Sequence, residues 1–573
     1  MEGRFASVVL LHPSLVHRDR VFTYSIPGGL DVHVGSVVRV PLGRKRANGV
    51  VVDLLDRADV PRTVALIASL GPGLDEDLVD LARWTAERYC ASLGEALATA
   101  VPERIASEED AVVPATPIAT PIATPAATPD ASWLRAWRGG PALLRSLAAR
   151  TRGVYSMQPP PAQDRGPLIA SLAASAVGEG RGVLVLLPEV RFRSSVEAAL
   201  EDAFGAGLAR LGSNRSNRVR YRGWCALRGG DTRIACGGRA AVFAPVPDLG
   251  LIVIDDESHV SYKERRQPRF HARTVAAERA RRSGATLVTV GVPPSIEVAA
   301  AVAARQMTLV VPPATARGSH PPVQIVDLSA SRERLVPSGR TIAAAKMAMR
   351  RGERVMIMTH RGGDEPAKVF ERAVRATGAT RPALLDARSG AAALREAITR
   401  ADLIVATPVI AKDIPLPRAG LVAICHADAA LAQTDFRTGE EAFATWWRAA
   451  RFAATVLIET ADPAHPAVRA LVRYDPAVLA TDEIARRKEL GYPPFGGLAR
   501  IAAPSDRADG IATTLEEAGA TVLGPVERDG RALLAVRAPT RAVLERLLAP
   551  LAAVWRDEGT DVRIDIDPRD VLA

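Results

Sequence analysis

Short apolar runs rich in β-branched residues recur between alanine-rich helical stretches from about residue 154 to residue 475. The runs lie at 182–188, 251–254, 286–290, 354–358, 403–406 and 421–425. Strands that are apolar throughout are typical of parallel sheets buried on both faces, and their alternation with helices is typical of α/β folds. The pattern predicts two α/β lobes, which we place at residues 133–320 and 321–475.

The N-terminal part has a different pattern and predicts a β-rich domain over residues 1–106. Residues 37–40 and 49–53 predict two strands. Proline, asparagine and glycine between them predict a hairpin loop over residues 41–49. Three consecutive basic residues lie at the tip of this loop: Arg44, Lys45 and Arg46.

The segments that flank the lobes are predicted as follows. Residues 75–98 have helical spacing and predict one helix. A proline at every fourth position of residues 115–129 predicts an extended linker, placed at 107–132. Residues 133–150 predict one short helix, and strand and helix patterns over residues 476–573 predict a C-terminal α+β domain.

Composition narrows the class of protein. Of 573 residues 48% are apolar and 24% charged, which is ordinary for a globular protein and excludes wholesale disorder. The four cysteines form no CxxC pair, so we expect no structural zinc and a reducing compartment. No apolar run reaches the ~18 residues that a membrane span needs. We therefore expect a cytoplasmic protein.

The formal net charge of +10 comes almost entirely from arginine, because the chain has only six lysines. Eight arginines and a single acid lie between Arg210 and Arg239. Guanidinium groups bind phosphate bidentately, and a basic surface gains affinity for nucleic acid by releasing counterions. The candidates for DNA contact in this stretch are Arg215, Arg218, Arg220 and Arg222. A solvated arginine face is the alternative.

A cluster of acids, Asp255, Asp256 and Glu257, directly follows the apolar run 251–254. Ligands of open α/β sheets bind at the carboxyl ends of strands, where acids often hold the magnesium of a nucleotide. A helix N-terminus is the alternative interpretation. No Gly-Lys pair exists in the chain, and residues 154–165, where a phosphate-binding loop is expected, contain three prolines without N–H groups. We therefore expect a degenerate nucleotide site that binds neither ATP nor magnesium.

Two other features are predicted to be structural. His259 and His271 are expected to be surface or satisfied core residues rather than metal ligands. The pair Trp446-Trp447 lies in a helical stretch and is expected to pack in the core.

Several segments are similar to primosomal protein N′, the PriA family of replication restart helicases, over nearly the full chain. Residues 38–51 resemble the family's N-terminal DNA-binding segment, and 487–495 resemble the start of its C-terminal domain. Further similar segments are 243–257, 261–263 and 268–273 around helicase motif II, 427–428 and 435–437 in the second lobe, and 565–568.

The departures from the family pattern concern the motor. The phosphate-binding loop is absent, and the Asp-Glu-Glu-His box reads Asp255-Asp-Glu-Ser258. The Ser-Ala-Thr motif reads Gly291-Val-Pro293, and the arginine-bearing motif VI reads Trp446-Trp-Arg-Ala-Ala-Arg-Phe452. The cysteine-rich zinc insert is missing. The pattern is similar to that of the degenerate PriA proteins of high-GC bacteria.

The resemblance implies a replication restart protein with two RecA-like lobes that recognises stalled forks and D-loops. It implies that the N-terminal domain holds a 3′ end through Arg39, Arg44, Lys45 and Arg46, with Arg20 as a further candidate. The implied partners are forked and single-stranded DNA, single-strand-binding protein and the machinery that loads the replicative helicase, at the nucleoid. Because several parts of the phosphoryl-transfer site are lost together, we expect no ATP-driven unwinding.

Two alternatives stay open. One is an active ATP-dependent 3′-5′ helicase with an atypical nucleotide site, for which the retained acids are the only support. The other is a protein-binding scaffold that touches DNA only non-specifically.

Overall fold

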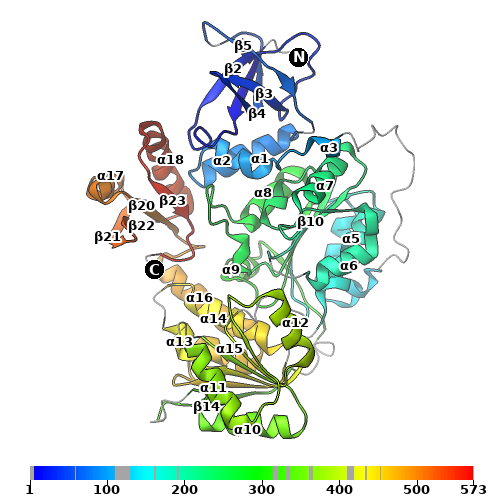
Figure 1. Cartoon of the computed structure of the whole chain (residues 1–573), viewed down its shortest axis with the longest axis vertical. Coiled ribbons are helices and arrows are strands. Elements are labelled where there is room, and N and C mark those ends of the chain that lie inside the picture. The colour runs from blue at the N-terminus through cyan, green and yellow to red at the C-terminus, as the bar shows by residue number, and fades with distance from the viewer. Residues whose placement is uncertain are drawn as a thin grey trace.

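The computed structural model arranges the chain as a column of three units with a fourth at its side (Figure 1). The N-terminal domain lies at the top, lobe 1 in the middle, lobe 2 at the bottom, and the C-terminal domain beside the column. The structure describes residues 5–58, 60–71, 73–109, 130–160, 163–189, 193–313, 320–330, 336–360, 365–408, 418–432, 435–451 and 453–571. Most of the predicted linker, residues 110–129, lies outside the described residues.

The N-terminal domain is a six-stranded sheet in the order β5-β2-β1-β4-β3-β6, followed by helices. The elements are β1 (Phe5–Leu10), β2 (Val21–Ser25), β3 (Val37–Leu42), β4 (Lys45–Leu55), β5 (Val64–Ala65), β6 (Ala68–Ser69), α1 (Glu76–Arg88), α2 (Leu93–Ala100) and α3 (Ala106–Glu109). The predicted helix 75–98 is therefore two helices. Ser92 starts the second with a reciprocal capping box to Glu95, which breaks the run after Tyr89.

The predicted hairpin loop over residues 41–49 is also wrong in extent. Strands β3 and β4 run on until Leu42 pairs with Lys45, so only Gly43 and Arg44 form the turn. Gly43 has a φ of +58°, which glycine adopts without steric cost. Val40 and Ala47 pair across the strands and are buried, so packing extends the ladder through residues that favour turns.

Lobe 1 is a seven-stranded sheet in the order β13-β7-β12-β11-β8-β10-β9, with every pairing parallel. Its strands are β7 (Val154–Met157), β8 (Gly182–Leu186), β9 (Leu208–Arg210), β10 (Ile234–Gly237), β11 (Leu249–Asp255), β12 (Thr286–Val290) and β13 (Thr308–Val310). Its helices are α4 (Gly140–Ala148), α5 (Arg165–Gly178), α6 (Ser195–Phe204), α7 (Asn217–Gly229), α8 (Ala272–Ser283) and α9 (Ile296–Ala303). The predicted helix 133–150 is a short 3-10 helix, Ser132–Ala136, followed by α4, because Gly139 with φ +80° interrupts it.

Lobe 2 repeats this architecture with a six-stranded parallel sheet in the order β14-β19-β18-β15-β17-β16. Its strands are β14 (Val323–Asp327), β15 (Val355–Thr359), β16 (Pro382–Leu385), β17 (Leu403–Ala406), β18 (Ala419–Cys425) and β19 (Ala453–Thr460). Its helices are α10 (Gly339–Arg350), α11 (Glu365–Thr377), α12 (Ala391–Arg400), α13 (Ala427–Leu431), α14 (Thr438–Ala450) and α15 (Pro466–Arg473). Trp446 and Trp447 are buried in its core, as predicted.

Helix α16 (Pro476–Leu490) packs against α9 and α15 and leads into the C-terminal domain. This domain is a four-stranded antiparallel sheet in the order β21-β22-β20-β23. Its elements are β20 (Gly497–Ala503), α17 (Ala508–Glu517), β21 (Thr521–Arg528), β22 (Arg531–Ala538), α18 (Arg541–Glu558) and β23 (Arg563–Ile566).

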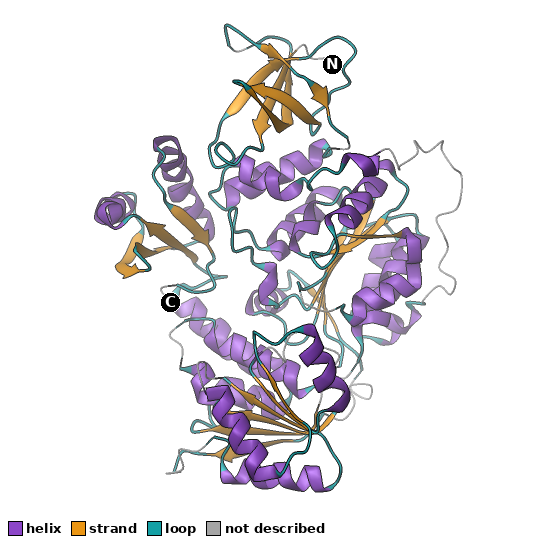
Figure 2. Cartoon of the chain, viewed as in Figure 1, coloured by secondary structure: helices purple, strands orange, loops and turns teal. Residues whose placement is uncertain are grey.

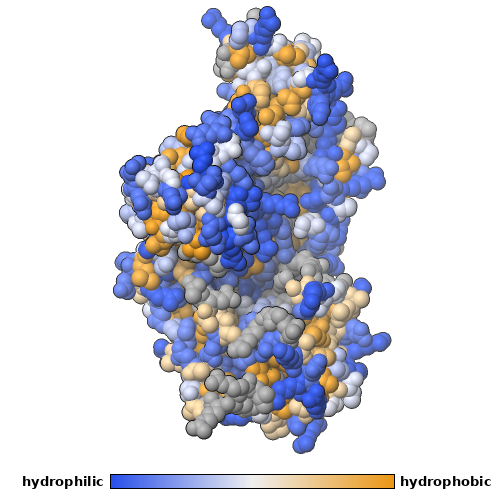
Figure 3. All heavy atoms as spheres, turned by 60° about the vertical axis from the view of Figure 1, so that its left-hand side comes forward, coloured by the Kyte–Doolittle hydropathy of each residue, from blue (hydrophilic) through white to orange (hydrophobic). Residues whose placement is uncertain are grey.

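The α/β fold class with two parallel lobes, a β-rich N-terminal domain and an α+β C-terminal domain is confirmed (Figure 2). The exact domain boundaries stay a prediction. Within the described ranges, no helix combines the length and apolarity that crossing a bilayer requires. The side of the molecule on which the C-terminal domain lies is mostly hydrophilic, with apolar side chains in small scattered groups (Figure 3).

Candidate functional site

The three acids singled out from the sequence lie at the carboxyl end of β11, a central strand of lobe 1. Asp255, Asp256 and Glu257 are 0%, 6% and 2% exposed. After the strand the backbone turns sharply, and Asp256 takes a φ of +46°. Gly291 makes room for this turn, since a Cβ there would lie 3.1 Å from the Asp256 Cα. The acids form a turn and do not begin a helix, so the interpretation as a helix N-terminus is wrong.

Each of these carboxylates is bound by a different arginine. Arg165 Nε donates to Asp255 Oδ1 at 2.6 Å. Arg448 donates to both oxygens of Asp256, at 2.9 and 2.8 Å. Arg273 Nη1 donates to Glu257 Oε2 at 2.7 Å. Guanidinium groups thus occupy the acids that a magnesium ion would need.

Burial and pairing act in opposite directions on the protonation of this cluster. Burial alone would raise the pKa of Asp256, but the Arg448 guanidinium holds that pKa well below its usual value. At Glu257 burial wins over the Arg273 charge and the hydrogen bonds from Ser295, so the pKa of this carboxyl is raised. Ser295 donates its backbone N–H to Glu257 at 2.6 Å.

The space left beside Asp256 is small. A hollow of about 20 Å³ is lined by nine residues: Pro159, Pro160, Gln163, Arg165, Asp256, Val292, Trp447, Arg448 and Arg451. Such a volume holds about one water molecule. Pro159 and Pro160 lie in the segment where a phosphate-binding loop is expected, and they form one wall that offers no N–H groups. Among the described residues no group of three or more acidic, histidine or cysteine side chains forms a metal site.

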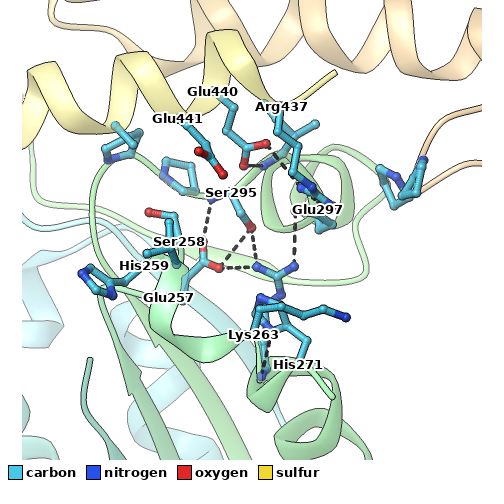
Figure 4. A pocket seen from close by; sticks show the side chains of 18 of the residues that line it. Glu257, Ser258, His259, Lys263, His271, Ser295, Glu297, Arg437, Glu440 and Glu441 are labelled. Carbon is cyan, nitrogen blue, oxygen red and sulfur yellow. Dashed lines mark hydrogen bonds and ion pairs between the residues drawn. The ribbon is translucent and has the colours of Figure 1, made fainter. Parts of the chain in front are cut away.

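A larger cavity of about 320 Å³ lies between lobe 1, lobe 2 and the C-terminal domain (Figure 4). Charges of alternating sign run along its wall. Arg273 contacts Glu257 and, at 3.2 Å, Glu297. Arg437 from lobe 2 contacts Glu297 at 2.8 Å, and Glu440 follows on α14. The cavity is therefore walled by groups that already neutralise one another.

The two histidines of this region have structural partners, as predicted. His259 is 7% exposed, and its Nδ1 lies 2.8 Å from the Ser261 hydroxyl. His271 Nδ1 accepts the Arg273 N–H at 3.2 Å and caps the N-terminus of α8. Burial, with Arg273 nearby, holds the pKa of His271 well below its usual value.

The basic hairpin has the opposite character. Arg44, Lys45 and Arg46 are exposed at the turn between β3 and β4. Arg39 pairs in register with Asn48, and Pro41 with Arg46, so Arg39 and Arg46 project from the same face of the sheet. Arg20, exposed, directly precedes β2. In the described part of the chain none of these five side chains forms an ion pair.

The arginine-rich stretch 210–239 forms α7 and its surroundings, and acids meet most of its charge. Arg215 contacts Glu197 and Glu201 at 2.7 and 2.6 Å. Arg218 and Arg222, 65% and 60% exposed, both contact Glu108. Arg220 donates to Asn217. The excess positive charge of this stretch is therefore smaller than its composition indicates.

Sequence reasoning found the acids and missed their partners. Arg165 and Arg448 lie 90 and 192 residues from the carboxylates they bind. Arg273 stood inside a segment that resembled motif II, but nothing in the segment assigned it to Glu257. The pairing of Glu297 with Arg437 had no sequence signal.

Comparisons with known proteins match both ends of the chain. Residues 7–102 match the family model of the PriA 3′ DNA-binding domain, and residues 488–569 match that of the primosomal protein N C-terminal domain. The basic hairpin lies inside the first match.

Known relatives extend the similarity to most of the chain. The replication restart protein PriA of Treponema pallidum is 26% identical, with 87% of this chain and 88% of that protein covered. The probable replication restart protein PriA of Mycobacterium leprae is 28% identical, with 95% of each covered. Among solved structures, the E. coli DExH-box NTPase HrpB aligns with a TM-score of 0.37 and 17% identity over 56% of this chain and 40% of that one. The two matched domains and the relatives that span nearly the whole chain make this chain similar to the PriA replication restart proteins, at both ends and over most of its length.

Proposed function

We propose that this protein recognises stalled forks and D-loops, holds a 3′ end of DNA in its N-terminal domain, and helps to reload the replicative helicase without ATP-driven unwinding. The observation that carries the proposal is the basic hairpin inside the matched 3′ DNA-binding domain. Its partners would be forked and single-stranded DNA, single-strand-binding protein and the helicase-loading machinery, in the cytoplasm at the nucleoid.

The hairpin supports DNA contact because its cations are unpaired and outward-facing. Arg44, Lys45 and Arg46 have no acid partner within the described chain, so their charge is available to phosphates. Arg39 and Arg46 project from the same face of the sheet, so DNA bound by both would lie against that face. A cation that binds a DNA phosphate releases a counterion from the DNA. The unpaired cations of the hairpin can each do so, whereas a cation that is already paired with an acid of the protein releases fewer counterions.

The acid cluster supports the absence of a motor. Nucleotide hydrolysis needs a cradle of N–H groups, a lysine on the phosphates and carboxylates that hold magnesium. Here the carboxylates are bound to Arg165, Arg448 and Arg273. The hollow of about 20 Å³ beside Asp256 is far smaller than a nucleotide. ATP and magnesium are therefore proposed not to be cofactors, and zinc likewise.

The test is fluorescence-anisotropy binding to a model fork with a free leading-strand 3′-hydroxyl, in parallel with the same fork blocked by a 3′-phosphate. We expect preference for the free end, and loss of that preference when Arg44, Lys45 and Arg46 are changed to alanine. A matched control removes the exposed charges of Arg281 and Arg282 on α8, which should leave the preference intact. Equal binding to both forks by the unaltered protein would overturn the end-holding role.

The two alternatives give different results. An active helicase would show DNA-stimulated ATP hydrolysis above the level of a heat-inactivated sample. A protein scaffold would bind both forks equally and lose affinity steeply with salt, because only non-specific phosphate contacts would hold the DNA.

A further inference from the structure

The surface where the two lobes meet is formed on the lobe 2 side by α14 and the residue that precedes it. In Figure 4 this helix, drawn in yellow, runs above the green elements of lobe 1. Arg448, near its C-terminal end, reaches into lobe 1 and binds both carboxylate oxygens of Asp256. It also donates to the Ser258 hydroxyl at 2.9 Å. Both partners of the ion pair are at least nine-tenths buried.

A second attachment lies at the other end of the same helix. Arg437, the residue before α14, contacts Glu297 of α9 at 2.8 Å. Glu440 accepts the backbone N–H of Ile296, the first residue of α9, at 3.0 Å. The eleven residue-to-residue steps from 437 to 448 span ~16 Å of helix, so the two attachments hold α14 against lobe 1 at both ends.

The end of the C-terminal domain fastens both lobes from outside. In lobe 1, Lys263 Nζ contacts Asp565 at 2.8 Å and donates to the Ile566 carbonyl at 2.6 Å. In lobe 2, Arg569 contacts Glu441 at 3.0 Å, and the Val571 N–H donates to Asp435 at 3.0 Å. Residues 565–571 therefore form a strap across the junction.

We infer that the two lobes are held closed permanently by the protein's own Arg448–Asp256 ion pair. In nucleotide-driven domain closure a ligand between the domains supplies the charge that draws them together, and its loss lets them separate. Here the Arg448 guanidinium of lobe 2 supplies that charge to the Asp256 carboxylate of lobe 1. A side chain is neither hydrolysed nor released, so this attraction between the lobes persists. Separation would break a two-pronged ion pair whose two members are at least nine-tenths buried. The helicase scaffold is then a rigid support that does not cycle between open and closed forms.

This inference concerns the conformation of the lobes and does not depend on DNA recognition. If the protein failed to distinguish fork ends, the closed state would be unaffected. If the lobes opened, end recognition by the N-terminal domain would still stand.

The experiment measures the distance between the lobes by electron–electron double resonance. Spin labels are attached at Asp202→Cys on α6 and Lys346→Cys on α10, both exposed positions. The four native cysteines are buried and free, so labelling can be directed to the introduced ones. We expect one narrow distance distribution that is the same with and without ATP and magnesium. A shift on adding nucleotide to the otherwise unaltered chain would overturn the inference.

The decisive variant is Arg448→Gln, which should broaden the distribution toward longer distances. Adding Arg437→Gln should broaden it further, because the second attachment is then also removed. The matched control is Arg165→Gln, which breaks a neighbouring buried arginine–aspartate pair whose two members both belong to lobe 1. This control should leave the distribution narrow.

A folding failure is separated from opening by a gentler change. Arg448→Lys keeps the charge and loses the two-pronged hydrogen bond, so it should fold and show an intermediate broadening. Melting curves of each variant report whether the lobes themselves remain folded. A distribution unchanged from the parent in both Arg448 variants would overturn the inference.

Discussion

Arginine does opposite things at two places in this molecule. At the lobe junction Arg165, Arg273 and Arg448 lie against buried carboxylates, and Arg273 contacts Glu297 as well as Glu257. At the N-terminal hairpin Arg44 and Arg46 project from a two-residue turn, with no acid partner in the described chain. The residue type is the same in both places. At the junction the guanidinium groups form ion pairs within the protein, whereas at the hairpin they remain available to bind a ligand.

The comparison teaches that local arginine content is a poor guide to a DNA-binding surface. The stretch 210–239 contains eight arginines and a single acid. Glu108, Glu197 and Glu201 nevertheless form ion pairs with several of these arginines. The hairpin has only three consecutive cations, and none of them pairs with an acid among the residues that the structure describes. Available charge, after internal pairing, is the quantity that decides binding to phosphate.

The largest expected effect distinguishes the two regions by stability. Arg273→Met leaves the Glu257 carboxylate buried without its cation, which should cost about 3–5 kcal/mol in the free energy of unfolding. Lys45→Met removes an exposed cation and should change that free energy by no more than about 0.5 kcal/mol. Denaturant unfolding of both variants measures the difference. Equal midpoints would mean that the pair at the junction contributes nothing.

The next effect is on the salt dependence of DNA binding. Replacing Arg44, Lys45 and Arg46 by alanine should reduce the slope of log affinity against log salt by about 3. Replacing Arg218 and Arg222 should reduce it by about 1, because Glu108 offsets one of the two charges. Anisotropy titrations from low to moderate salt provide the slopes. A larger reduction at α7 than at the hairpin would reverse the assignment of the two surfaces.

A smaller effect concerns pH and the histidine that caps α8. Burial keeps the pKa of His271 well below its usual value, and its Nδ1 must stay unprotonated to accept the Arg273 N–H. The unfolded chain binds this proton below about pH 6.5 and the folded chain does not. Stability from this group is therefore complete above that pH and falls as pH decreases, by up to about 1.4 kcal/mol per pH unit.

The measurement is the free energy of unfolding between pH 7 and pH 5. His271→Asn keeps a capping acceptor and cannot titrate, so its curve should be flatter than that of the parent protein. The exposed His33 gives the control His33→Asn, which should follow the parent curve. Parallel curves for the parent and His271→Asn would contradict the role of this cap.

The smallest expected effect is the response to nucleotide, which should be nil. A ligand at 100 times its dissociation constant would stabilise the folded state by about 2.7 kcal/mol. Thermal melts with millimolar ATP and magnesium should therefore coincide with melts without them. A raised midpoint would show that the folded chain binds a nucleotide, which would contradict this prediction.

The elements that local pattern controls were predictable from the sequence. The strand that ends in Asp255 is apolar over residues 251–254 and lies buried in a parallel sheet, as its composition indicated. The length of β4 was not predictable, because burial of Val40 and Ala47 extends the ladder into a segment of turn-forming residues. Local propensity is weak beside such packing.

The acids of the candidate site were predictable from the sequence, but their arginine partners were not. The acids are adjacent in sequence, so their clustering was visible. Their arginines come from α5, α8 and α14, and only the folded sheet and the meeting of the lobes bring them together. Long-range charge pairing leaves no spacing pattern along the chain, and a single sequence cannot reveal it.

The three arginine–carboxylate pairs at the end of β11 also bear on engineering of the chain. A variant designed to hold a metal ion there requires each acid to lose its guanidinium. Each single substitution on that route leaves a buried charge unpaired, so each intermediate variant is expected to be less stable than the parent protein. Such a site would therefore have to be built by replacing several arginines together.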